Sequence, residues 1–99
     1  MAAYVDRAIW QWRGRLWCHL LADDLGELHD FARRLGMPRA AFQDRRYPHY
    51  DLPEERRLIA VELGAVQVTL REIIVVARRL REQRERESAS ALAPRDLSR

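Results

Sequence analysis

Cysteine is almost absent from this 99-residue chain, and lysine and asparagine are missing altogether. The single cysteine, Cys18, cannot form an internal disulfide and excludes a zinc site built from cysteine pairs. Glycine and proline number four each, too few for a collagen-like or low-complexity chain. No apolar run approaches the roughly 20 residues of a membrane-spanning helix. Because no basic and apolar leader follows Met1 either, we expect a cytoplasmic protein without a membrane partner.

The length and composition predict one small folded domain. Hydrophobic residues make up 47% of the chain and charged residues 33%, as in ordinary globular proteins. All 18 basic residues are arginine, against 15 acidic residues, so that the net charge is +3. Arginine suits bidentate contacts with carboxylates and phosphates. A net charge this small is nevertheless mild compared with that of dedicated nucleic-acid binders.

Apolar periodicity predicts alternating strands and helices. We expect strands at 3–6, 15–22, 45–50 and 65–68, a short helix at 40–42, and main helices at 25–35, 52–63 and 70–87. This order predicts an α/β fold with a sheet of about four mostly parallel strands, three main helices and a protruding C-terminal helix. The domain should span residues 1–87. Residues 88–99, which lack periodicity, should form a disordered tail.

Polar side chains follow the predicted strands at the points where they end. His19 and Asp23 come at the end of the second strand, and His49 and Asp51 at the end of the third. In a parallel sheet these carboxyl ends share one edge, where ligands bind. Asp6 joins this edge if the first strand is parallel to the second. If that strand is antiparallel, Asp6 should lie at the opposite edge.

We interpret His19, His49, Asp51 and Asp23 as candidate catalytic residues. Histidines and carboxylates in one cleft can serve as general acids and bases near neutral pH, or as ligands of a divalent metal ion. The spacing contains no short metal-binding motif, so the sequence leaves these two uses open. Candidate substrate-binding residues surround them, with the arginines placed to hold an anion: Arg56, Arg57, Tyr50 and Asp6.

Each candidate also has a purely structural interpretation. Asp23 or Asp24, and likewise Asp51, occupy positions where a helix N-cap belongs, and capping alone explains such residues. His19 alternates with apolar residues and could be a hydrogen-bonded core histidine. Cys18 is expected to be a buried, inert thiol. The tryptophans at 10, 12 and 17 are expected to fill the core, the alternative being that they stack on a nucleic-acid base.

Residues 3–80 resemble the family called domain of unknown function 4031, found in small proteins of bacteria and bacteriophages. The resemblance rests on an ordered set of short motifs: Tyr4-Val5-Asp6, Gly14-Arg15-Leu16-Trp17-Cys18-His19-Leu20, Ala22-Asp23, Glu27-Leu28-His29, Phe42-Gln43, His49-Tyr50-Asp51 and Gly64-Ala65-Val66. It implies that His19, Asp23, His49, Tyr50 and Asp51 belong to the motif set of the family. The family brings no agreed activity. This chain departs from the pattern at Arg7 and Ala8, where prolines are expected.

Three functions remain open at this point. The first is a hydrolase-like enzyme that acts on a phosphate-containing or otherwise anionic substrate through the histidines and aspartates. The second is a module that binds a nucleotide or nucleic acid through an arginine-rich surface. The third is an interaction protein that forms a homodimer through its last helix, whose apolar stripe is wider than one neighbour needs.

Overall fold

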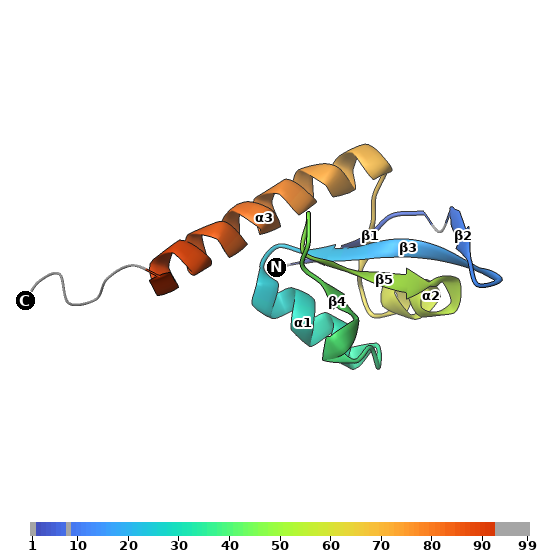
Figure 1. The fold of residues 1–99 in the computed structure, drawn as a ribbon. Coiled ribbons are helices and arrows are strands. Elements are labelled where there is room, and N and C mark those ends of the chain that lie inside the picture. Colours follow the sequence, from blue (N-terminus) through green and yellow to red (C-terminus); the bar gives the residue numbers. More distant parts are fainter. Residues whose placement is uncertain (1, 8, 93–99) are drawn as a thin grey trace, which may run out of the picture.

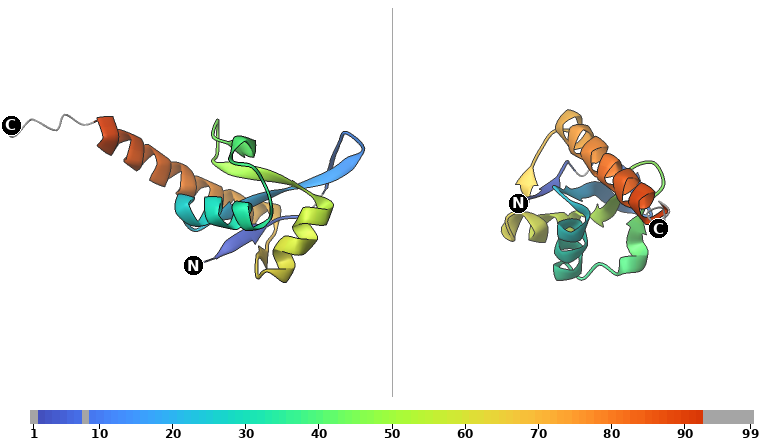
Figure 2. Two further views of the ribbon diagram at one scale, coloured as in Figure 1. Left: turned by 90° about the horizontal axis from the view of Figure 1, so that it is seen from below. Right: turned by 90° about the vertical axis from the view of Figure 1, so that its left-hand side faces the viewer.

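Six strands form one mixed sheet in the part of the chain that the computed structural model describes, residues 2–7 and 9–92. Helices α1 and α2 lie on one side of this sheet and α3 crosses the other side (Figures 1 and 2). The strands are β1 (Ala3–Val5), β2 (Trp10–Trp12), β3 (Arg15–Ala22), β4 (Phe42–Gln43), β5 (His49–Pro53) and β6 (Val66–Gln67). The helices are α1 (Leu25–Arg34), the short 3-10 helix η1 (Arg39–Ala41), α2 (Glu54–Glu62) and α3 (Leu70–Leu92). No helix among the described residues is long and apolar enough to cross a membrane.

The strand order is β4-β5-β3-β1-β6, and β2 pairs with one end of β3. β3 is antiparallel to β1, β2 and β5, β4 is antiparallel to β5, and β6 is parallel to β1. The α/β class with three main helices is therefore confirmed. The prediction of mostly parallel strands is wrong.

Two short strands that the sequence did not predict explain this difference. β4 follows α1 and runs in the direction of β3, as a crossover requires, but a hairpin then inserts β5 between β4 and β3. β2 forms a hairpin with β3 through Arg13 and Gly14, whose positive φ angles of 54° and 74° suit a two-residue turn. Strands of two or three residues are too short for apolar alternation to reveal.

Side chains alternate along β3 and β5, which gives the middle of the sheet two distinct faces. The face under α1 and α2, here called the core face, carries residues that are at most 1% exposed: Cys18, Leu20, Ala22, Tyr50 and Leu52. Leu28 and Ala32 of α1 and Ala60 of α2 are also fully buried in the core. Burial raises the pKa of the Cys18 thiol to about 12, in keeping with the inert thiol that we predicted.

The opposite face, here called the histidine face, is covered only in part. It carries Trp17, His19 and Leu21 of β3 and His49 and Asp51 of β5. Leu21 is 2% exposed and joins the core with apolar residues of α3. The two histidines and Asp51 all remain partly exposed. Helix α3 therefore covers Leu21 but leaves the polar side chains of His19, His49 and Asp51 partly open to solvent.

Helix α3 begins at the predicted capping box. The backbone N–H of Glu72 donates to Thr69 Oγ1 at 3.1 Å, and the backbone N–H of Thr69 donates to Glu72 Oε1 at 2.8 Å. The helix protrudes from the sheet (Figure 1). It stays attached past its apolar stripe, because Gln83 Oε1 accepts a hydrogen bond from the N–H of Leu25 and Arg84 donates to Asp44.

The last residues of α3 lie in the segment predicted as a tail. The helix continues to Leu92, five residues into that segment, and Ser and Ala there are compatible with helix. Residues 93–99 lie outside the described residues. Leu70 and Val75 are 52% and 51% exposed, which is the surface that the predicted homodimer would use. That dimer stays a prediction.

Candidate metal centre

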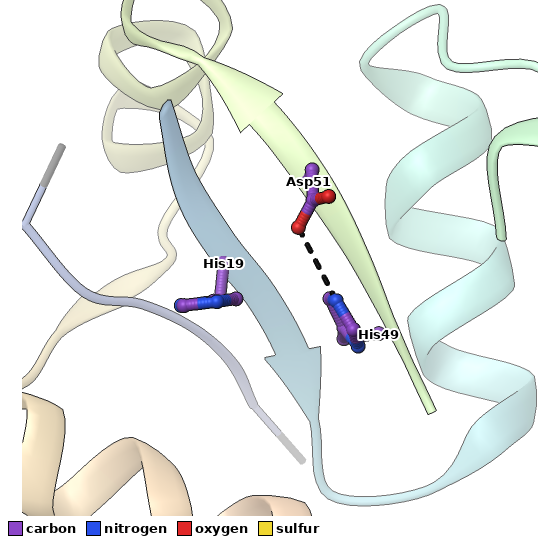
Figure 3. A group of neighbouring side chains, drawn as sticks. All are labelled: His19, His49 and Asp51. Carbon is purple, nitrogen blue, oxygen red and sulfur yellow. Dashed lines mark ion pairs between the residues drawn. The ribbon is translucent and has the colours of Figure 1, made fainter. Parts of the chain in front are cut away.

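Two histidines and one aspartate converge on the histidine face (Figure 3). His49 and Asp51 are two residues apart on β5, so both point to this side of the sheet. His19 of β3 is the direct cross-strand partner of Asp51. One ligand atom from each of the three side chains lies within 4.8 Å of the other two. The convergence predicted for these three residues is therefore present, although it lies in the middle of β3 rather than at its end.

The contacts of His49 define which of its ring nitrogens carries a proton. Nδ1 lies 2.7 Å from the backbone carbonyl of Tyr47. A carbonyl only accepts, so Nδ1 must be the donor. Nε2 is then the nitrogen with a free lone pair in the neutral ring, and it lies 3.2 Å from Asp51 Oδ1. Both atoms of this close pair can accept, which is the arrangement expected around a cation.

Asp51 has one oxygen that is held and one that is free. Gln43 Nε2 donates to Oδ2 in a short hydrogen bond. Oδ1 is buried and has no hydrogen-bond partner. The alternative prediction, that Asp51 only caps the next helix, is wrong, because α2 begins at Glu54 and its N-cap is Pro53, without a side-chain cap. A buried carboxylate oxygen without a hydrogen-bond donor is rare, and this one faces His49 Nε2 at 3.2 Å.

The electrostatics of the pair favour its charged forms. Burial lowers the pKa of His49, but the close pairing with the Asp51 carboxylate, the hydrogen bond to the Tyr47 carbonyl and the negative charge of Asp6 outweigh it, so that the pKa is raised. Burial raises the pKa of Asp51, but the hydrogen bond and charge of His49, with smaller effects of Gln43 and His19, lower it overall. A negative Asp51 carboxylate and a protonated His49 therefore stabilise each other in this arrangement.

Asp6 accepts two hydrogen bonds from His19 and orients its ring. The carboxylate is 3% exposed as a residue, and it accepts from the backbone N–H of His19 at Oδ1 and from His19 Nδ1 at Oδ2, each at 2.7 Å. This leaves Nε2 as the ring nitrogen available to a ligand. The expectation that an antiparallel first strand would carry Asp6 to the opposite edge is wrong. Val5 pairs with Leu20, so the antiparallel register places Asp6 opposite His19.

Arg57 belongs to the support of the site. Its Nε donates to the backbone carbonyl of Asp6 at 2.6 Å, and its terminal nitrogen donates to Gln67 Oε1 at 3.0 Å. The first turn of α2 thereby ties the end of β1 to β6. Two donors of Arg57 thus hold the backbone and a side chain of neighbouring strands, and its predicted role in substrate binding stays a prediction.

Three predicted site residues lie elsewhere. Asp23 accepts from the Tyr4 hydroxyl at 2.7 Å and from the N–H of Ala2, four residues along β3 from His19, or about 13 Å at the usual rise of a strand. Tyr50 lies on the core face, 1% exposed, with its hydroxyl 2.8 Å from His29 Nδ1. Arg56 donates to the carbonyl of Leu35 at the end of α1.

The physical reasons are simple. Asp23 lies beyond the last residue of β3, and Tyr50 alternates with His49 and Asp51 and so must face the other way. Asp24, one residue later, is the cap of α1, with Oδ1 accepting from the N–H of Glu27 at 2.8 Å. Each of these side chains has a structural role that accounts for it.

Two supporting residues escaped the sequence analysis. Gln43 lies on β4 and reaches Asp51 because Gln43 and His49 are cross-strand partners. Tyr47 contributes only its backbone carbonyl, which no sequence pattern can reveal. Gln43 stands in one of the short motifs quoted above, and that was its single available signal.

A small cleft opens beside the cluster. Tyr47, Leu21 and apolar residues of α3 line it together with His19 and His49. The Trp10 ring packs against the His19 ring, with ring centroids 4.6 Å apart. The two histidine rings themselves meet edge to face at 5.4 Å. A group bound between the histidines would therefore have aromatic and apolar walls.

Comparison with known proteins agrees with the resemblance noted in the sequence. Residues 3–81 match the family model described as "Protein of unknown function (DUF4031)". No curated protein and no solved structure matches the chain. The matched range contains every residue of the candidate metal centre. The match covers most of the 99 residues, and the chain belongs to the DUF4031 family.

Proposed function

We propose that this chain binds a divalent transition-metal ion through His19, His49 and Asp51 and uses it to hydrolyse a phosphate-containing or otherwise anionic substrate. One observation carries the proposal. Each of the three side chains keeps one ligand atom free toward the cluster while its other polar atom is hydrogen-bonded away from it. In a histidine or aspartate with a purely structural role, we expect the buried polar atoms to be hydrogen-bonded instead.

The supporting groups are those that metal sites use. A metal-binding histidine almost always donates its second ring N–H to a carboxylate or a backbone carbonyl, which orients the ring. Asp6 fills this role for His19, and the Tyr47 carbonyl fills it for His49. Gln43 orients the carboxylate of Asp51 in the same way.

The ligand set narrows the ion. Two imidazoles and one carboxylate suit Zn²⁺ and the neighbouring divalent transition metals rather than Ca²⁺ or Mg²⁺. A tetrahedral ion with bonds of about 2.1 Å separates its ligands by about 3.4 Å, close to the 3.2 Å between His49 Nε2 and Asp51 Oδ1. A ring nitrogen of His19 lies within 4.8 Å of both, so a small shift of this side chain toward the other two would complete a three-ligand site.

Three protein ligands leave a coordination position for water, as in catalytic zinc sites. Held by His19, His49 and Asp51, such an ion would lower the pKa of a bound water, which would then attack the phosphorus or carbonyl carbon while the bond to the leaving oxygen breaks and that oxygen takes up a proton. A cation held at the cluster would favour a substrate with negative charge.

Metal binding is the first test. Calorimetric titration of the metal-stripped protein with Zn²⁺ should show one site per chain. His49→Ala and Asp51→Ala should each weaken it at least tenfold. The third histidine provides the matched control: His29→Asn lies on the other side of the sheet, against Tyr50, and should bind Zn²⁺ as the wild type does. Equal weakening in all three variants, or no binding by the wild type, would contradict the site.

Turnover is the second test. The Zn²⁺- or Mn²⁺-loaded protein should hydrolyse an activated phosphodiester such as bis(p-nitrophenyl) phosphate, and a chelator should abolish the rate. His49→Ala should lose the rate, and His29→Asn should keep it. A rate that survives the chelator would instead assign the cluster to metal-free acid-base chemistry.

A further inference from the structure

The β2–β3 hairpin carries three tryptophans on the histidine face. Trp10 pairs with Trp17, and Trp12 pairs with Arg15, so all of these side chains lie on the side of the sheet that bears His19. The tryptophans at 10, 12 and 17 are here called the tryptophan ridge. The ridge starts at the candidate metal centre, where the Trp10 and His19 rings are 4.6 Å apart, and continues to Trp12, whose ring is 5.5 Å from that of Trp17.

The ridge is not part of the core, contrary to our prediction for these tryptophans. Trp12 is 53% exposed, Trp10 and Trp17 are partly exposed, and none of them belongs to the buried cluster. Figure 1 shows the hairpin extending past the sheet on the side away from the end of α3. Exposed clusters of large aromatic side chains mark binding surfaces more often than scattered apolar residues do.

Two arginines accompany the ridge. The Arg13 guanidinium lies 4.5 Å from the centre of the Trp12 ring, and that of Arg15 lies 5.8 Å from the Trp17 ring. Arg15 also pairs with Glu55. Arg13 has no ion pair among the described residues. Its charge is therefore free for an anion next to an exposed indole.

The backbone of Arg13 gives a second, independent reason. Its φ of 54° lies in the left-handed region, and it is the one residue other than glycine with positive φ in the part of the chain that is described. Asn or Gly suits the first central position of this turn better than Arg does. Such strain tends to persist where the side chain has a function. The turn thus places a guanidinium at the tip of the ridge, although the backbone of Arg13 is in an unfavourable conformation there.

We propose that the tryptophan ridge binds single-stranded nucleic acid and directs a phosphodiester toward the candidate metal centre. Exposed indoles stack on unpaired bases, and guanidinium groups pair with the phosphates between them. Bases in a duplex are already stacked and cannot reach such a surface. The ridge spans more than one ring, so it fits a strand better than a single nucleotide. This inference names the substrate class of the proposed hydrolase and rests on that proposal.

Binding can be measured separately from catalysis. Fluorescence anisotropy with a labelled single-stranded oligothymidylate, in excess chelator, should show affinity that falls with salt. Trp12→Ala should weaken binding about 5- to 150-fold, the range for losing one stacked base. Leu16→Ala is the matched control: Leu16 is an exposed apolar residue on the opposite face of the same hairpin, and its loss should leave the affinity unchanged.

Arg13→Asn separates a ligand contact from a structural role. Asparagine tolerates positive φ, so the melting temperature should stay equal or rise. The slope of log affinity against log salt should nevertheless become shallower by about 0.7, the value for one phosphate contact on a single strand. A structural arginine would produce the reverse: a lower melting temperature and an unchanged slope.

Further outcomes distinguish strand binding from metal binding alone, from binding of a single nucleotide and from self-association. The wild type should bind the oligonucleotide with the same affinity in excess chelator and with Zn²⁺, so failure of the metal site leaves strand binding intact. Normal Zn²⁺ binding without strand binding at low salt would overturn the inference alone. Equally tight binding of thymidine monophosphate would overturn the single-strand assignment. Self-association of the wild type that Trp12→Ala abolishes would replace the strand by a second copy of the chain.

Discussion

The core face and the histidine face of the sheet are built from the same two strands, yet their polar groups differ in whether they have hydrogen-bond partners. On the core face the Tyr50 hydroxyl and His29 Nδ1 lie 2.8 Å apart, and each group satisfies the other. On the histidine face, His49 Nε2 and Asp51 Oδ1 lie 3.2 Å apart and no neutral donor lies between them. The presence of a histidine is therefore less informative than the partner of its second nitrogen.

Alanine substitutions at adjacent residues of β5, one on each face, test this difference most strongly. Leu52→Ala on the core face should lower the free energy of unfolding by about 2–5 kcal/mol, because Leu52 is fully buried and the change leaves a cavity. Asp51→Ala, the adjacent residue on the other face, should change it by about 1 kcal/mol or less, since it removes a partly exposed ion pair. Urea denaturation measures both. An equally large loss in Asp51→Ala would make the polar cluster a structural element.

Asp6 tests the support of the histidine face. In Asp6→Asn the amide oxygen can still accept from the backbone N–H of His19, but the NH₂ group then faces Nδ1 and moves the ring proton to Nε2. That tautomer has no free lone pair at Nε2. Zn²⁺ affinity should fall about 10- to 100-fold, as for other supporting groups of metal ligands.

A control separates this effect from simple destabilisation. Asp23→Asn removes a carboxylate that lies just beyond the end of β3. There it accepts a hydrogen bond from Tyr4 rather than from a histidine. Its Zn²⁺ affinity should match that of the wild type. Equal affinities in Asp6→Asn and the wild type would show that the orientation of His19 does not matter to the ion.

The sequence predicted the long elements well because their signals are local. The capping box of Thr69 and Glu72 and the apolar stripe of α3 are present as expected, and the eight-residue strand β3 has the predicted bounds. The strand directions were wrong because pairing between distant segments has no local signal. β4, with two residues, redirects β5, and no pattern in Phe42–Gln43 shows this.

The candidate site was predicted in part for the same reason. His19, His49 and Asp51 were chosen by residue type, and the sheet does bring them together. Asp23 and Tyr50 were chosen with them by proximity in sequence, but Asp23 lies beyond the end of β3, and Tyr50 faces the other way because side chains alternate along a strand. The supports from Asp6 and the Tyr47 carbonyl depend on register and on backbone geometry, which only the structure reveals.

The smallest effect concerns His29, the histidine beside the core face. Burial, with a smaller effect of the charge of Arg39, lowers its pKa in the folded protein. The unfolded chain then binds a proton more readily, so stability should be lost as the pH falls below about 6.5, the ordinary pKa of histidine. His29→Asn keeps an acceptor for the Tyr50 hydroxyl and removes the titration. Its free energy of unfolding should therefore decline less than that of the wild type between neutral and mildly acidic pH, as measured by urea denaturation at a series of pH values. A steeper decline in the variant would mean that the folded protein holds the His29 proton more tightly than the unfolded chain does, and the contrast between the two faces would then have to be given up.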